Sequence, residues 1–244
     1  MVPPDEMTRP VLPTPEELRA KLEAMRGSRG FLLQHHGAMA AFAPDLHAAY
    51  STMYSALTLT ERHLSPIEKE SVWLAVLVAV REAIGTHHLD LFRKHGGTTA
   101  QANTIMQLAG YAGAANAFAF VEAHWSTEFA GLDPASGYLD GFSRLCANAL
   151  EPEVAHLTLL ATHAALGQNW GVATHLIAAY AAGIAEDKLA EALSLIIWPT
   201  GVNRFVEACT VWHELMRAGR IMPSPRYKAW ADMPGQGQFQ AEPR

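Results

Sequence analysis

Acidic, basic and imidazole side chains gather at one bend of the chain. Glu70 precedes an apolar run at residues 72–80, and Arg81, Glu82, His87 and His88 follow it. A neutral imidazole can transfer protons near neutral pH, and a neighbouring carboxylate can assist it. A guanidinium can hold a substrate carboxylate through two parallel hydrogen bonds. We therefore predict that His88, Glu70 and Glu82 are catalytic residues and that Arg81 and His87 bind the substrate.

Two predicted helices place these side chains. Ser65, Pro66 and Glu68 form a helix-start pattern, and the apolar run that follows is typical of a buried helix. Residues 85–86 break this helix, and a second helix ends at the glycine pair at residues 96–97. If the first helix continued through the bend, Glu70 and His88 would share one face with the arginine between them.

The same pattern occurs a second time, at residues 150–183. Pro152 follows Pro66 by 86 residues, and His175 follows His88 by 87 residues, each with the same pattern around it. Such a nearly constant offset indicates a tandem duplication. We therefore predict two pseudo-symmetric helical units, with the helices at 72–80 and 157–165 buried at their centre.

The second copy has few charges at its bend. His156 stands where the first copy has a glutamate, and Gln168 and Trp170 precede His175. An amide and an indole orient a ligand better than they transfer protons. We predict that His156, Gln168, Trp170 and His175 bind the substrate.

This arrangement resembles the carboxymuconolactone decarboxylase and alkylhydroperoxidase D-like superfamily over residues 40–125 and 140–215. The family motif is a Leu-x-Pro start, a glutamate, two cysteines three apart, a histidine four residues later and a glycine. His88 and His175 stand at the position of this histidine, so the resemblance implies that His88 is the main catalytic candidate. The segment at residues 111–117 is similar to the Tyr-x-Gly-x-x-x-Ala pattern of the decarboxylase branch. The resemblance implies an all-α fold of two tandem repeats, no cofactor, and a homo-oligomer, for which a trimer would carry six repeats.

The cysteines of the motif are absent. Counting back from the two motif histidines, their positions hold Arg81 and Ile84 in one copy and Gln168 and Gly171 in the other. The only cysteines, at positions 146 and 209, lie outside the motif. Because a thiol peroxidase needs a thiolate pair, this pattern argues against that activity. The leading hypothesis is a cofactor-independent, decarboxylase-like lyase that acts on a small organic acid or lactone.

Two alternatives remain open at this stage. The chain has 12 histidines, and His156 and His163, seven residues apart, share a helix face, so a metal-dependent hydrolase or oxygenase could use such a cluster. The chain could also be a non-catalytic binding or assembly protein that retains the fold. We predict no metal ligand among the site residues, because adjacent histidines on a helix point apart.

Composition limits the partners. The formal net charge of −6 argues against nucleic acid, and no apolar run is long enough to cross a bilayer. Two cysteines imply no disulfide framework, and no signal peptide is visible, so we expect a cytoplasmic protein that binds a small molecule.

The predicted organisation has four parts. Residues 1–13 form a flexible arm, residues 14–130 hold the first repeat with its N-terminal helices, and residues 131–218 hold the second repeat. The proline-rich residues 219–244 are predicted to be an extended tail.

Overall fold

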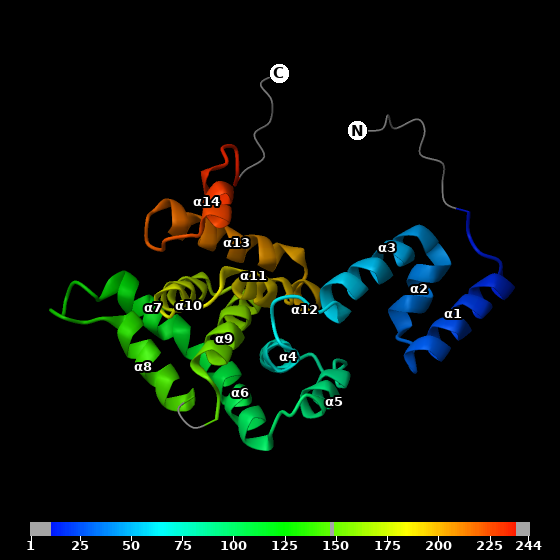
Figure 1. The fold of residues 1–244 in the computed structure, drawn as a ribbon, viewed down its shortest axis with the longest axis horizontal. Coiled ribbons are helices and arrows are strands. Elements are labelled where there is room, and N and C mark those ends of the chain that lie inside the picture. The colour runs from blue at the N-terminus through cyan, green and yellow to red at the C-terminus, as the bar shows by residue number, and fades with distance from the viewer. Residues whose placement is uncertain (1–10, 147–148, 238–244) are drawn as a thin grey trace. The chain divides into compact units, whose positions relative to one another are not determined.

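A computed structural model describes residues 11–146 and 149–237 of the chain. Within these ranges the regular structure is helical and no strand occurs, which confirms the predicted all-α class. The chain divides into two compact units, Met1–Thr60 and Glu61–Arg244 (Figure 1). The predicted flexible arm lies mostly outside the described residues.

The described part of the first unit, residues 11–60, contains three helices and one π-helical turn. Thr14 and Glu17 form a reciprocal capping box that starts the first of them, as the pattern Thr-Pro-Glu-Glu predicts. Burial is the main cause that lowers the pKa of His36, to about 4. The elements are α1 (Pro15–Arg29), α2 (Gln34–Phe42), α3 (Pro44–Tyr54) and the turn Ser55–Leu59.

The second unit carries the motifs. Its elements, in chain order, are α4 (Pro66–Val80), α5 (His87–Lys94), α6 (Thr99–Tyr111), a 3-10 turn (Ala112–Ala114), α7 (Ala115–His124), α8 (Pro134–Cys146), α9 (Pro152–Leu166), α10 (Asn169–Ala181), α11 (Glu186–Ser194), α12 (Ile197–Thr200), α13 (Val202–Arg217) and α14 (Pro225–Asp232).

Helices α4 and α9 lie side by side in the interior of this unit. Ser65 and Glu68 make the predicted capping box at the start of α4, with Pro66 in the first turn. Both helices are buried on more than one side: Val72 and Leu157 belong to one hydrophobic cluster, and their near neighbours Leu74 and Leu159 belong to another. A helix that is apolar all round needs such enclosure, because each of its faces must be removed from water.

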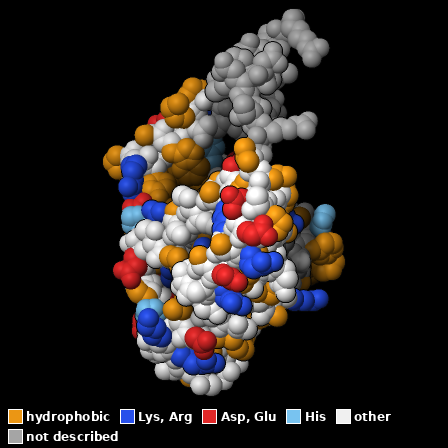
Figure 2. All heavy atoms as spheres, turned by 90° about the vertical axis from the view of Figure 1, so that its right-hand side faces the viewer, with side chains coloured by type: hydrophobic (Ala, Val, Ile, Leu, Met, Phe, Trp, Pro, Cys, Tyr) orange, Lys and Arg blue, Asp and Glu red, His pale blue; other side chains and the backbone are white. Residues whose placement is uncertain are grey.

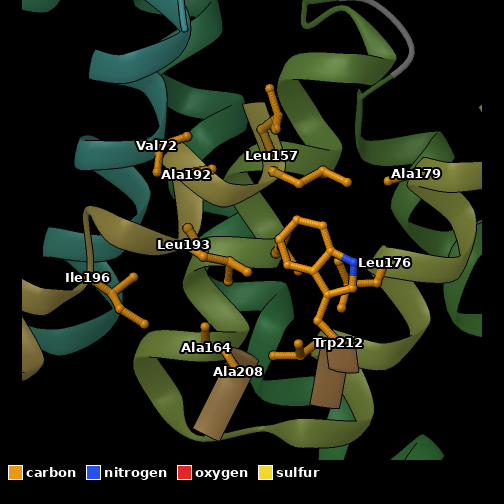
Figure 3. Packing of buried hydrophobic residues seen from close by; sticks show 14 of the residues in the cluster. Val72, Leu157, Ala164, Leu176, Ala179, Ala192, Leu193, Ile196, Ala208 and Trp212 are labelled. Carbon is orange, nitrogen blue, oxygen red and sulfur yellow. The ribbon is translucent and has the colours of Figure 1, made fainter. Parts of the chain in front are cut away.

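The larger cluster surrounds Trp212 of α13 (Figure 3). Its indole is 2% exposed, and its Nε1–H donates to the hydroxyl of Tyr180 at 3.0 Å. Leu176, Leu193 and Ala164 reach the same cluster from three other helices. Burial of this one side chain contributes about 2–3 kcal/mol to stability.

One lysine joins the beginnings of the two central helices. Lys188 Nζ of α11 lies 2.7 Å from Glu68 Oε1 and 2.7 Å from Glu153 Oε1. Glu68 is in the first turn of α4 and Glu153 is in the first turn of α9. These two helices therefore begin close to the same point on α11.

The tail differs from its prediction, because residues 225–232 form helix α14. Pro225 suits the first position of a helix, and Ser224 precedes it in an extended conformation. The helix packs on its own chain: Tyr227 stacks on Trp212 with ring centroids 5.2 Å apart, and Arg226 pairs with Asp187. The proline-rich composition predicts an extended chain, whereas Pro225 starts a helix.

The two predicted repeats share one core, so the predicted boundary near residue 130 does not separate compact units. Helices α4 and α9 each contain 15 residues, and each begins at a proline. These correspondences support a duplication, which itself stays a prediction.

Charged side chains of both signs are interspersed over the face drawn in Figure 2. Over residues 11–146 and 149–237, the helices are all too short or too polar to cross a membrane.

Candidate functional site

The predicted catalytic residues Glu70 and His88 meet in the interior. Glu70 Oε2 of α4 lies 2.7 Å from His88 Nδ1 of α5, and both side chains are buried. The residues are 18 positions apart in the chain, so the loop between the helices and the packing of α5 on α4 bring them together. An anionic carboxylate only accepts hydrogen bonds, so Nδ1 of His88 donates and a neutral ring has its lone pair on Nε2.

Aromatic rings fix the plane of the His88 imidazole. Trp73, three residues after Glu70 on the same helix, stacks on His88 with centroids 4.3 Å apart and an interplanar angle of 19°. The ring of His87 lies 4.1 Å from that of His88. Burial lowers the pKa of His87, and the neighbouring His88 lowers it further. Trp73 was not predicted as part of the site, although its position one turn from Glu70 was visible in the sequence.

The single stripe suggested by the sequence does not form, because α4 ends at Val80. Arg81 adopts a left-handed conformation with φ 60°, and Glu82 N–H bonds back to Leu77 O at 2.9 Å. The chain turns there, before the predicted break at residues 85–86. Arg81 is therefore not in helical register with Glu70 and His88.

Arg81 and Glu82 instead line a solvent-open cavity of about 450 Å³. Apolar side chains supply most of its wall, and the cavity lies where α4 and α5 meet. Glu82 Oε1 accepts the backbone N–H of Ile84 at 2.6 Å, which fixes this carboxylate over the turn. The apolar wall consists of Leu74, Leu77, Val78, Leu89 and Met106.

Arg81 is the one residue other than glycine with positive φ in residues 11–146 and 149–237. Gly167 ends α9 with φ 68°, in the position that Arg81 holds after α4. The backbone bonds also correspond, because Gln168 N bonds His163 O at 2.9 Å in the second half. The sequence comparison matched Arg81 with Gln168. The helix ends correct this match to Gly167, so the one-residue shift lies after the turn.

His156 of α9 and His175 of α10 meet in the same way as Glu70 and His88. His156 Nδ1 lies 3.0 Å from His175 Nδ1, and the two residues are 19 positions apart. One of the two nitrogens must donate and the other accept. His175 is 0% exposed, and its Nε2 has no hydrogen-bond partner among the described residues.

A phenol and an amide hold a third imidazole beside this pair. His163 Nδ1 lies 2.7 Å from Gln168 Oε1, and His163 Nε2 lies 2.7 Å from the hydroxyl of Tyr138. The amide oxygen can only accept, so Nδ1 carries the proton and the Tyr138 hydroxyl donates to Nε2. The His163 ring stacks on that of His175 at 5.3 Å. Tyr138 was missed because nothing in the sequence links α8 to the histidine of α9.

This buried group is electrically neutral at neutral pH. Burial lowers the pKa of His156 and of His163 to about 4. Burial lowers the pKa of His175 well below its usual range, and the neighbouring His163 and His156 add to the effect. Burial also raises the pKa of the Tyr138 phenol. The second half therefore lacks the carboxylate–imidazole pair of the first.

Trp170 lies apart from the buried imidazoles. Its Nε1–H donates to Glu122 Oε2 at 2.8 Å, and its ring contacts Phe118 and Tyr138. That Gln168, Trp170 and His175 bind the same substrate as His88 stays a prediction.

Both cysteines are poor nucleophiles. Burial raises the pKa of Cys146 and of Cys209 to about 11, so both thiols are protonated at neutral pH. Each is free: Cys146 belongs to the cluster around Phe142, and Cys209 lies on α13.

No group of three or more histidine, cysteine, aspartate or glutamate side chains in the described part of the chain has an arrangement that could hold a metal ion. His156 and His163, which the sequence suggested for such a site, make the hydrogen bonds given above.

Residues 44–123 match the family model described as the carboxymuconolactone decarboxylase family. The match contains Glu70, Arg81 and His88, and it ends before the second copy of the motif begins. No curated protein and no solved structure matches the chain.

Proposed function

We propose that the chain, whose residues 44–123 match the carboxymuconolactone decarboxylase family, is a cofactor-independent lyase. It removes carbon dioxide from a small organic acid or lactone. The observation that carries the proposal is the buried hydrogen bond of 2.7 Å between Glu70 Oε2 and His88 Nδ1.

The pair provides a prepared proton donor. Glu70 accepts the Nδ1–H of His88 and so fixes the tautomer and orientation of the ring. Nε2 is then the nitrogen that would pass a proton to the substrate. His88 is buried and does not line the cavity, so this transfer requires the cavity to open toward the imidazole. Trp73 stacks on the ring at 4.3 Å and so limits its rotation. A positioned general acid of this kind contributes about 10²–10⁴-fold in rate.

The cavity where α4 and α5 meet supports binding of a small acid. Its volume of about 450 Å³ falls within the range of small-molecule sites, and its wall is mostly apolar. Arg81 is the cation that lines it and would hold one end of a carboxylate substrate. An apolar wall destabilises a bound carboxylate because it replaces the water around the charge. Loss of carbon dioxide removes this charge, so the wall favours the reaction.

The reaction balances without an oxidant or a metal. The bond between the substrate carbon and its carboxylate breaks, and its electron pair moves into an adjacent carbonyl to form an enolate. Carbon dioxide leaves. The His88 imidazolium donates one proton to the enolate carbon and is restored by one proton from solvent, while Glu70 keeps its charge.

The backbone at Arg81 also supports a functional role. Left-handed φ costs a non-glycine residue about 1 kcal/mol or more, and the second half has glycine in this position. Glycine would relieve the strain. Retention of arginine here fits a residue whose guanidinium is needed at the cavity.

The test is carbon dioxide release from a panel of small lactone acids and β-keto acids. We expect one or more of them to be turned over equally with and without a chelator. His88→Ala should abolish most of this activity, while Arg93→Gln, an exposed change on the same helix, should not. Activity that a chelator removes would favour the metal-dependent alternative. No turnover of any acid by a folded protein would favour a binding or assembly protein.

A further inference from the structure

A second and larger cavity lies away from Glu70 and His88. Its volume is about 740 Å³, and residues of α7, α8, α10 and α13 line it together with the loop at residues 131–133. Its apolar wall consists of Leu132, Leu139, Ala173, Ile177 and Leu215. Charged side chains of both signs line the same space, namely Glu122, Asp133 and Arg220.

Glu122, Asp133 and Arg220 form no ion pairs with one another. In the described ranges, neither Glu122 nor Asp133 has a lysine or arginine within ion-pair distance, and Arg220 has no carboxylate within that distance. All three residues are exposed, so each can meet a ligand from solvent. A ligand with complementary charges would find partners already placed around one cavity.

Other contacts fix the two carboxylates. Glu122 Oε2 accepts the indole N–H of Trp170 at 2.8 Å. Asp133 Oδ1 accepts the backbone N–H of Ser136 at 2.9 Å, in the first turn of α8. Each carboxylate retains lone pairs for a second donor. Their positions are therefore set before a ligand arrives, which lowers the entropic cost of binding.

The indole of Trp170 is held on several sides. In addition to its bond to Glu122, it lies parallel to Phe118 at 6.4 Å and perpendicular to Tyr138 at 5.5 Å. Indole rings attract ammonium groups through their electron-rich faces. The cavity therefore combines two carboxylates and an indole, which favour a cation, with one guanidinium, which favours an anion.

We propose that this cavity binds a small aliphatic zwitterion, either a free amino acid or a dipeptide. Glu122 and Asp133 receive its ammonium group, and Arg220 receives its carboxylate. Leu139 and Ile177 contact its apolar side chain. A simple anion would be repelled by the two carboxylates, and a simple cation would leave the guanidinium without a partner. The cavity contains none of Glu70, Arg81 and His88, so the proposal does not depend on the lyase activity, and it assigns Trp170 to this cavity instead of to the lyase substrate.

The first test compares four probes by titration calorimetry at low salt: leucine, leucyl-leucine, 4-methylpentanoate and leucinamide. The third lacks the ammonium group, and the fourth has no free carboxylate. We expect leucine or leucyl-leucine to bind at least tenfold more tightly than both analogues. The tighter of the two shows whether the cavity prefers a free amino acid or a dipeptide. Absence of binding by both zwitterions, or equal binding of either analogue, would overturn the proposal.

The second test uses variants that keep shape and remove charge. Glu122→Gln retains an oxygen that can accept the Trp170 N–H, so loss of the ammonium partner is isolated. Arg220→Gln should weaken the binding of the zwitterion at least tenfold and leave that of leucinamide nearly unchanged. Arg217→Gln and Glu128→Gln, exposed residues that do not line the cavity, serve as matched controls. Zwitterion affinity unchanged in both cavity variants would refute the assignment.

Discussion

Glu70 and His156 have corresponding hydrogen bonds. Each lies within hydrogen-bond distance of Nδ1 of a histidine further along the chain. The distances are 2.7 Å to His88 and 3.0 Å to His175. One partner is a carboxylate and the other an imidazole, so only the first pair has the carboxylate–imidazole arrangement used in general acid–base catalysis. This difference leads to the first prediction.

His88→Ala should reduce kcat about 10²–10⁴-fold with little change in KM, because it removes the proton donor but not the anchor of the substrate. Glu70→Gln should reduce kcat less, since the amide can still hold the ring but has no charge. Steady-state kinetics on the acid found in the carbon dioxide assay provide the measurement. Equal activity of wild type and His88→Ala would exclude His88 as the donor.

Arg81→Gly should stabilise the protein and weaken substrate binding. Glycine adopts φ near 60° without strain, so the free energy of unfolding should rise by about 1 kcal/mol. Loss of the guanidinium should raise KM for the acid. Arg81→Ala removes the same charge but keeps a Cβ, so it should raise KM without the gain in stability. Denaturant unfolding of both variants separates the two effects, and equal stability of the two would show that the backbone is not strained.

The double variant Cys146→Ser, Cys209→Ser should retain its turnover. Burial raises the pKa of both thiols to about 11, and neither lies at a motif position. A modest loss of stability is expected at Cys146, because a buried hydroxyl there lies among apolar side chains. Peroxide reduction by the wild type that disappears in this variant would show that the thiols were wrongly dismissed.

Stability should fall steeply in mild acid. His156 and His163 have a pKa of about 4 in the folded protein and about 6.5 when unfolded, so the unfolded chain binds more protons between these values. The contribution of these two histidines to the free energy of unfolding should therefore be constant above pH 7. It should decrease by about 1.4 kcal/mol per pH unit per histidine between 6.5 and 4.

The variant His163→Gln separates the contribution of this histidine to the pH dependence of stability from the contribution of the carboxylates. Its loss of stability relative to wild type should become smaller as pH falls from 7 to 4, because the variant has one fewer buried imidazole to protonate. Urea unfolding at four pH values measures the difference. A difference independent of pH would mean that the pKa of His163 is the same in the folded and the unfolded protein.

Tyr138→Phe should cost about 1–3 kcal/mol, because it leaves Nε2 of His163 buried without a donor. Tyr111→Phe is the matched control, since its hydroxyl donates to a backbone oxygen at 2.9 Å from a less buried position. Thermal and urea unfolding should give the larger loss for Tyr138→Phe. A loss no greater than that of the control would show that the hydrogen bond from Tyr138 to His163 does not stabilise the protein.

The sequence allowed prediction of the central helices and of the candidate pair Glu70 and His88, because periodicity, caps and spacing are local signals. The contact of Tyr138 with His163 is different, since it joins two helices whose packing no local pattern specifies. The conformation of Arg81 was also not predictable. Arginine rarely takes positive φ, and only the bonding of the helix end identifies Gly167 as its counterpart. Helix α14 was missed because proline both starts and breaks helices.

The meeting of Glu68, Glu153 and Lys188 has an electrostatic consequence for the centre of the fold. Both glutamates lie in the first turn of a helix, where the aligned peptide dipoles place about half a positive charge. Two such helix ends and one ammonium would repel one another without compensation. The two carboxylates supply about as much negative charge as these three groups supply positive charge. Two like helix ends can therefore begin beside one lysine with almost no net charge between them.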